Sequence, residues 1–105
     1  MVQGTTPTYT LEIDDYDLTE SSVFVTIKSG CQIVTKTGSD LTIEFDGEMS
    51  TVMFSLTQEE TIKFEVGNAK VQVRFINADG EAFATEDGQF KVKGVLLKEV
   101  IHYGG

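Results

Sequence analysis

The acidic run that begins at Asp14 has residue types and a spacing that a metal ion could use. Calcium binds several carboxylate and carbonyl oxygens on one loop, and Asp14, Asp15 and Asp17 lie close enough in sequence to share an ion. Aspartate is also a common turn residue, because its side chain bonds nearby backbone amides. We favour the turn interpretation and keep Asp14, Asp15 and Asp17 as the metal-ligand candidates, with no metal and no cofactor expected.

A second acidic cluster holds two Asp-Gly pairs, Asp79-Gly80 and Asp87-Gly88, together with Glu81 and Glu86. Asp-Gly pairs supply the positive φ angles of tight hairpins, so we expect two turns here. Paired carboxylates can act as acid and base on a glycosidic bond, but that reaction needs a deep cleft, which a chain of 105 residues seldom forms. The cluster therefore does not predict a glycosidase.

The supply of histidine and cysteine argues against nucleophilic catalysis and against a zinc site. The chain has one His, His102 near its end, and one Cys, Cys31, whereas structural zinc needs four such ligands and catalytic zinc three. No glycine-rich nucleotide-binding motif occurs. We therefore predict no catalysis by a Ser–His or Cys–His pair, no structural zinc and no nucleotide binding. Cys31 lies in an alternating apolar pattern, where we expect it to pack in the core.

The charge balance restricts the class of partner. The chain has 8 Lys and Arg against 17 Asp and Glu, a net charge of −9, and its basic residues are spread from Lys28 to Lys98 without a run that could neutralise several phosphates. The longest apolar run, 94–97, is far shorter than the roughly 20 residues of a membrane-spanning helix. The N-terminus lacks the basic and apolar parts of a secretory signal. We expect neither nucleic acid nor a membrane as a partner, and synthesis in a cytoplasm.

Apolar and polar residues alternate with a period of two along most of the chain, which is typical of β-strands. The expected strands are residues 8–13, 23–28, 31–36, 41–45, 51–56, 69–77, 81–86 and 89–97. Short strands at this spacing favour an antiparallel sandwich over a small barrel. The length fits a single domain, residues 1–105, with 1–7 and 102–105 as candidates for flexible ends.

One short helical turn is expected between two of these strands. Thr57 and Glu60 have the spacing of a capping box, in which each side chain bonds a backbone amide of the other residue. The turn cannot extend far, because Ile62, Phe64 and Val66 return to a period of two.

Three stretches of the chain resemble small structural proteins carried by phages and prophages of Gram-positive bacteria. They are Gly4-Thr5-Thr6-Pro7-Thr8, residues 56–61, and residues 71–75 continuing through Asp79-Gly80-Glu81-Ala82. These stretches are similar to the N-terminal module of the baseplate upper proteins of tailed phages. The resemblance implies an all-β, antiparallel immunoglobulin-like β-sandwich of about seven or eight strands. It also implies a virion protein of the tail or baseplate, without enzyme activity, whose partners are other tail or baseplate proteins or further copies of itself.

The residues Gly4, Thr5, Thr6, Pro7 and Thr8 are the candidates for binding such a partner. Their threonine-rich composition suits an extended backbone, and Pro7 disfavours a helix before it. An extended segment can add to the exposed edge of a neighbouring sheet, and deletion of residues 2–7 is then expected to weaken assembly without unfolding the domain. A frayed end is the competing interpretation.

Two other classes of function stay open from the sequence. The first is an immunoglobulin-like module that binds carbohydrate or calcium through the loops around residues 14–20 and Asp87; for the calcium-binding form, stabilisation by calcium would be the sign. The second is a small acidic inhibitor that occupies a basic site on a host protein, which the net charge of −9 would suit.

Overall fold

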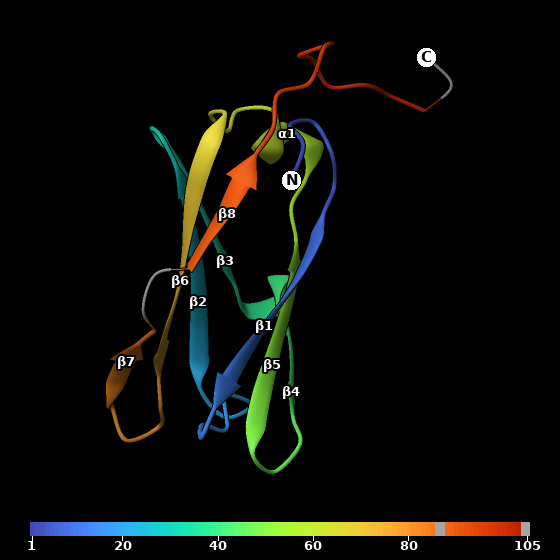
Figure 1. Cartoon of the computed structure of the whole chain (residues 1–105). Helices are drawn as coiled ribbons and strands as arrows, with labels where there is room; N and C mark the ends of the chain where they lie inside the picture. Colours follow the sequence, from blue (N-terminus) through green and yellow to red (C-terminus); the bar gives the residue numbers. More distant parts are fainter. Residues whose placement is uncertain (86–87, 104–105) are drawn as a thin grey trace.

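The computed structural model describes residues 1–85 and 88–103, which fold into two antiparallel sheets packed face to face (Figure 1). The smaller sheet has the order β1-β5-β4, and the larger has the order β3-β2-β6-β7 with β8 also paired to β6. The strands are β1 (Thr8–Asp14), β2 (Ser22–Ser29), β3 (Gln32–Thr37), β4 (Thr42–Phe45), β5 (Met49–Ser55), β6 (Gly67–Ile76), β7 (Ala82–Ala84) and β8 (Gly88–Val92). The expected all-β sandwich is confirmed.

The period of two in the sequence separates a buried face from an exposed face on each strand. In β2, Val23, Val25 and Ile27 are buried between the sheets, and in β5 the buried apolar residues are Val52 and Phe54. Burial of one such side chain stabilises the fold by about 1.5–3 kcal/mol. The core therefore lies between the two sheets, and every second strand residue is left for the outer surfaces.

Aspartate side chains stabilise the turns by accepting hydrogen bonds from nearby backbone amides. Asp46 accepts hydrogen bonds from the backbone amides of Glu48 at 2.9 Å and Met49 at 2.8 Å, and Gly47 has a φ of 104° in the turn between β4 and β5. These two amides hold the pKa of the Asp46 carboxyl below its usual value. The expected turn at Asp79-Gly80 joins β6 to β7, whereas Asp87 of the other expected turn lies outside the described residues.

The expected helical turn is α1 (Gln58–Thr61), and a second single turn, the 3₁₀ helix η1 (Gly38–Asp40), precedes β4. Thr57 Oγ1 accepts from the amide of Glu60 at 3.2 Å, and Glu60 Oε1 accepts from the amide of Thr57 at 2.8 Å. The capping box is therefore confirmed. Residues 62–66 then form turns and bends that bury Phe64 before β6 begins.

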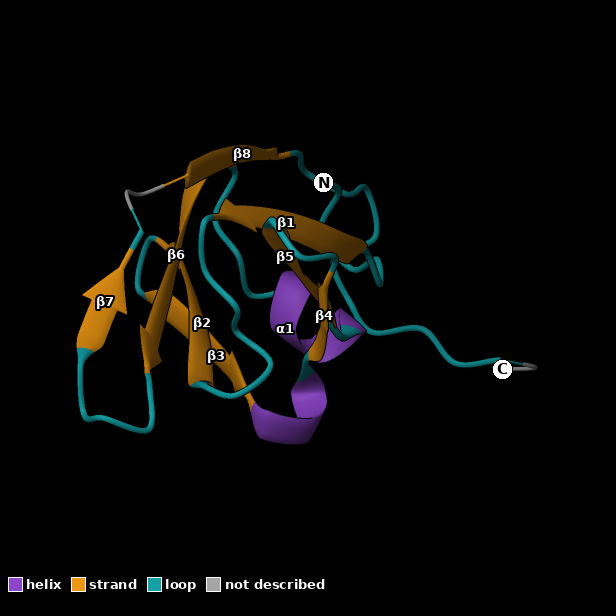
Figure 2. Cartoon of the chain, turned by 90° about the horizontal axis from the view of Figure 1, so that it is seen from below, coloured by secondary structure: helices purple, strands orange, loops and turns teal. Residues whose placement is uncertain are grey.

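Two sequence-based expectations differ from the structure. Cys31 is exposed and not in the core, because Gly30 and Cys31 form the turn between β2 and β3 instead of continuing the alternation. The last strand, expected over residues 89–97, ends at Val92. Beyond it the backbone of Lys93 bonds to the N-terminal segment, and residues 94–103 leave the body of the sandwich (Figure 2).

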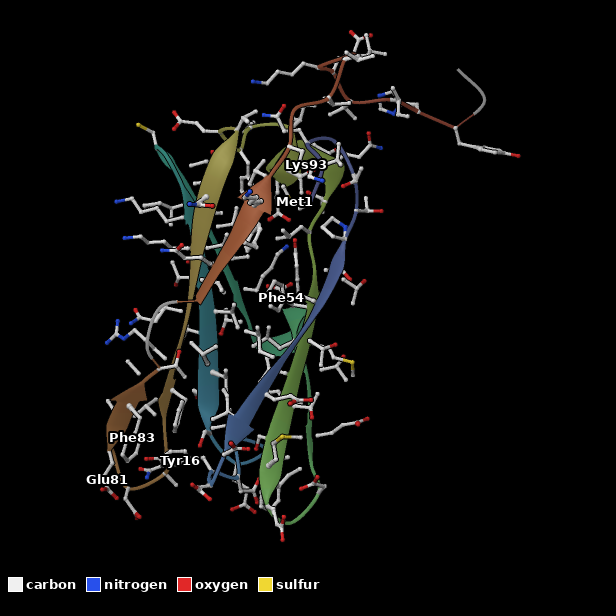
Figure 3. The ribbon with its side chains drawn as sticks, in the orientation of Figure 1. Met1, Tyr16, Phe54, Glu81, Phe83 and Lys93 are labelled. Carbon is white, nitrogen blue, oxygen red and sulfur yellow. The ribbon has the colours of Figure 1, made fainter. Side chains whose placement is uncertain are left out.

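An aromatic group closes the β7 end of the sandwich. The ring of Tyr16 lies 5.1 Å from that of Phe75 and 5.2 Å from that of Phe83, and Phe75 stacks on Phe83 at 5.2 Å. Figure 3 shows Tyr16 and Phe83 at this end and Met1 and Lys93 at the other. Aromatic side chains thus pack at one end of the sandwich, and the N-terminal residue Met1 lies beside Lys93 at the other.

Candidate functional site

The carboxylates of Asp14, Asp15 and Asp17 do not converge on a common site. Asp17 accepts a hydrogen bond from the backbone amide of Thr19 at 3.0 Å, whereas Asp14 and Asp15 line an open hollow together with Glu48. Asp15 adopts a left-handed φ of 68°, and its amide donates to the carbonyl of Glu48 at 3.0 Å. In residues 1–85 and 88–103, no three His, Cys, Asp or Glu side chains are arranged to hold a metal ion. The geometry agrees with the turn interpretation of this loop.

The N-terminal segment is bonded within its own domain. The Leu56 amide donates to the carbonyl of Pro7 at 3.0 Å, and Thr61 Oγ1 donates to the carbonyl of Thr5 at 2.8 Å. Gln3 is 2% exposed, and its side-chain amide donates to the carbonyl of Phe64. Residues 1–7 are therefore bonded to the sandwich and not frayed. The prediction that Gly4, Thr5, Thr6, Pro7 and Thr8 bind a partner stays a prediction.

A C-terminal arm, residues 94–103, projects away from the sandwich in both views of the chain (Figures 1 and 2). Four of its large apolar side chains are exposed, with Leu96 and Tyr103 fully open to solvent and Leu97 and Ile101 more than half exposed, whereas Val95 and Val100 are half-buried. The side chain of Gln58 in α1 holds the arm at one point: it donates to the carbonyl of Ile101 at 3.0 Å and accepts from the same residue's amide at 3.1 Å. The arm is thus attached to the end of the sandwich while four of its large apolar side chains remain exposed.

The outer face of the five-stranded sheet carries a basic surface, which we define as Lys28, Lys70, Arg74 and Lys91. These four of the eight basic residues are exposed and lie on β2, β6 and β8. Lys28 and Lys70 are direct partners across the β2–β6 pairing. The described strand residues that alternate outward on this sheet include no Asp or Glu.

An apolar hollow of about 280 Å³ adjoins this basic surface near β7. Phe24, Ile76 and Ala82 line it from the outer face of the sheet, and Arg74 lies opposite Phe24 in the β2–β6 register. Phe24 is 41% exposed and Ile76 is 40% exposed. The outer face of the larger sheet is thus a mixture of basic and apolar side chains.

The outer face of the three-stranded sheet carries negative charge, opposite to that of the five-stranded sheet. We define its acidic surface as Glu12 and Asp14 on β1 and Glu44 on β4, all three exposed. Glu12 and Glu44 both pair with Thr51 of β5, so they flank the central strand in one row. The outward strand residues of this sheet include no Lys or Arg.

Neither surface is evident from the order of residues in the chain. The basic residues are scattered along the sequence, with Lys28 and Lys91 far apart, and the register of β2, β6 and β8 brings them onto one face. Their assignment to outward-facing positions could have been predicted, because residues two apart in a strand share a face and the buried apolar residues mark the other face.

Comparisons with known proteins identify no family for this chain: no protein-family model matches it, and no curated protein matches its sequence. The resemblance to phage structural proteins therefore stays a prediction. No helix in the described part of the chain is long and apolar enough to cross a membrane.

Proposed function

We propose that the protein is a non-enzymatic structural component of a phage tail or baseplate that attaches to other virion proteins through its C-terminal arm. Two arguments support the proposal: the resemblance of three stretches of the chain to phage structural proteins, and one structural observation. Four large apolar side chains stand exposed on the arm: Leu96, Leu97, Ile101 and Tyr103.

Exposed apolar side chains in a continuous segment mark a surface that another molecule covers. Burial of one Leu side chain against a partner is worth about 1.5–3 kcal/mol, so two or three such contacts offset the cost of ordering the arm. The extended arm, held at Ile101 by Gln58, can pair with the edge of a partner's sheet or lie in a partner's groove. An attachment role needs no catalytic group.

The experiment compares incorporation into phage particles made in a strain that carries the gene. Particles from cells producing the unaltered chain, a Leu96→Asp/Tyr103→Asp variant or a Lys98→Gln/Glu99→Gln control are purified by density centrifugation and tested for the protein by mass spectrometry. We expect the unaltered chain and the control to be recovered with the particles, and the apolar-to-aspartate variant to stay in the supernatant.

Two results would contradict the proposal in different ways. Absence of the unaltered chain from purified particles would overturn the virion role. Equal recovery of the unaltered chain and the Leu96→Asp/Tyr103→Asp variant would overturn the role of the arm.

A further inference from the structure

We infer that copies of this chain associate face to face, with the basic surface of the five-stranded sheet of one copy against the acidic surface of the three-stranded sheet of the next. The inference rests on the proposed structural role and names a partner for the sheet faces, which is a second copy. The arm remains free for a different protein.

The arrangement of the basic surface calls for an anionic partner. Lys28 and Lys70 are direct cross-strand partners, and side chains in such positions have Cβ atoms about 4.5–5.5 Å apart. Like charges at this separation destabilise a sheet. Among the described residues, the carboxylate that forms an ion pair is Glu60, and its partner is Lys36 rather than Lys28, Lys70, Arg74 or Lys91. A carboxylate supplied by another molecule would relieve the repulsion between Lys28 and Lys70.

The acidic surface of the same chain supplies carboxylates at a similar separation. Glu12 and Glu44 are separated by two strand spacings, about 10 Å, with Thr51 between them. On the basic surface, Lys28 and Lys91 also lie on either side of β6, offset by two residues along it, because Lys28 pairs with Lys70 and Lys91 with Asn68. Lysine side chains are long and flexible, so Lys28 and Lys91 can reach carboxylates at this separation.

Apolar side chains on both surfaces favour a protein partner over a nucleic acid. Phe24 and Ile76 lie beside Arg74 on the basic surface, and Met49 and Met53 alternate outward on the central strand of the other sheet. Aromatic residues, Met and Arg are enriched where protein surfaces meet. A phosphate backbone offers no such apolar contact, and a chain of net charge −9 is repelled by it.

The contact is heterologous, because two different surfaces meet. In a pair, one copy then keeps an unused acidic surface and the other an unused basic surface, so association continues into a closed ring or an open stack. The attraction depends on charge and is expected to weaken when salt shortens the screening length from about 8 Å at 0.15 M to about 3 Å at 1 M.

The test uses two charge-reversal variants of the full chain. Lys28→Glu/Lys70→Glu removes the net positive charge of the basic surface, and Glu12→Lys/Glu44→Lys reverses the net charge of the acidic surface. Mass in solution is measured by light scattering over a concentration series. We expect the unaltered chain to associate, each variant alone to show an apparent dissociation constant at least about tenfold higher, and an equimolar mixture of the two to associate again.

Control variants carry the same change of net charge at exposed positions away from the two surfaces. They are Lys63→Glu/Lys98→Glu and Glu20→Lys/Glu99→Lys, and we expect both to associate like the unaltered chain. Thermal melts of all variants separate a loss of association from a loss of folding. The arm variant Leu96→Asp/Tyr103→Asp is expected to self-associate normally, which separates this inference from the particle experiment.

Three results would overturn the inference. The first is an unaltered chain that stays monomeric at every concentration in 0.15 M salt. The second is a mixture of folded charge-reversal variants that fails to associate when the unaltered chain does. The third is binding of random-sequence single-stranded DNA by the unaltered chain, lost in Lys28→Glu/Lys70→Glu, which would assign the basic surface to phosphates.

Discussion

Glu60 links the helical turn to the five-stranded sheet through one carboxylate. Its Oε1 accepts from the Thr57 amide and from Lys36 Nζ, both at 2.8 Å. Partial burial by itself would raise the pKa of this carboxyl, but the hydrogen bonds from Lys36 and Thr57 and the charge of Lys36 outweigh it and hold the pKa below its usual value. The pair is only partly exposed, so solvent screens it less than a surface ion pair.

The Glu60→Gln variant tests this link. A carboxylate whose pKa is lowered by folding stabilises the folded state above its unfolded pKa and loses that contribution as the pH falls through its folded pKa. We expect Glu60→Gln to lower the free energy of unfolding by about 1 kcal/mol at pH 7, and this difference to decline as the pH falls below the unfolded pKa of about 4.3 and through the lowered pKa of the folded state. Urea unfolding at several pH values measures it. Glu59→Gln, on the same turn, is the control; a loss that stays the same at every acidic pH would contradict the assignment.

Gly4 occupies a position where the backbone conformation and a close side-chain contact both favour glycine. Its φ is 75°, and a Cβ there would lie 3.1 Å from Ile62 Cδ1. We expect Gly4→Ala to destabilise the fold by about 1–2 kcal/mol through the left-handed backbone together with this contact. Gly38→Ala is the matched control, because Gly38 has a φ of 56° with open space around its Cβ position. Thermal melts should show the larger loss for Gly4→Ala, and equal losses would exclude a role for the Ile62 contact.

The N-terminal segment is hydrogen-bonded to the larger sheet and forms part of the sandwich. Val2 forms a parallel bridge with Lys93, and the Met1 carbonyl accepts from the Lys93 amide at 2.8 Å. The buried side chain of Gln3 adds a bond to Phe64. This segment therefore covers the free edge of β8, which protects an otherwise exposed strand edge.

Deletion of residues 2–7 is accordingly expected to destabilise the domain itself. Each lost hydrogen bond costs about 0.5–1.5 kcal/mol, so the deletion should lower the free energy of unfolding by about 2–4 kcal/mol. Truncation after Glu99, which removes the Gln58–Ile101 bonds but no sandwich residue, is the comparison and should cost less than about 1.5 kcal/mol. Urea unfolding of both proteins provides the measurement. A deletion that leaves stability unchanged would instead show that residues 2–7 do not contribute to folding, as both sequence-based interpretations of this segment expected.

The elements show which parts of the structure local sequence patterns can predict. Alternation located all eight strands and the spacing of Thr57 and Glu60 located α1, because both signals depend on neighbouring residues only. Cys31 was misplaced because the turn between β2 and β3 falls at residues 30–31, one position later than the expected turn at residues 29–30. The two charged surfaces were missed because they depend on which strands pair, and pairing between β6 and β8 joins residues that local patterns do not relate.

For the whole molecule, the structure separates a body that holds the core from an arm that holds exposed apolar residues. The body holds the buried apolar core, to which Phe54 and Phe64 belong. On the arm, the side chains of Leu96 and Tyr103 are fully exposed. Local opening of a segment without packed contacts costs little free energy, whereas opening of a core strand approaches the cost of global unfolding.

Limited digestion with chymotrypsin measures this separation, because the protease cleaves after large apolar residues and needs an unfolded segment. We expect the first cuts after Leu96, Leu97 or Tyr103, leaving a resistant body that starts at Met1 and is identified by mass spectrometry. The same digestion in urea is the control and should cut the body as well. A first cut after Tyr16 or Phe45 would instead place the least stable segment in the sandwich. In purified particles the arm is expected to be protected, because the same side chains that attract the protease are those that the proposed partner buries.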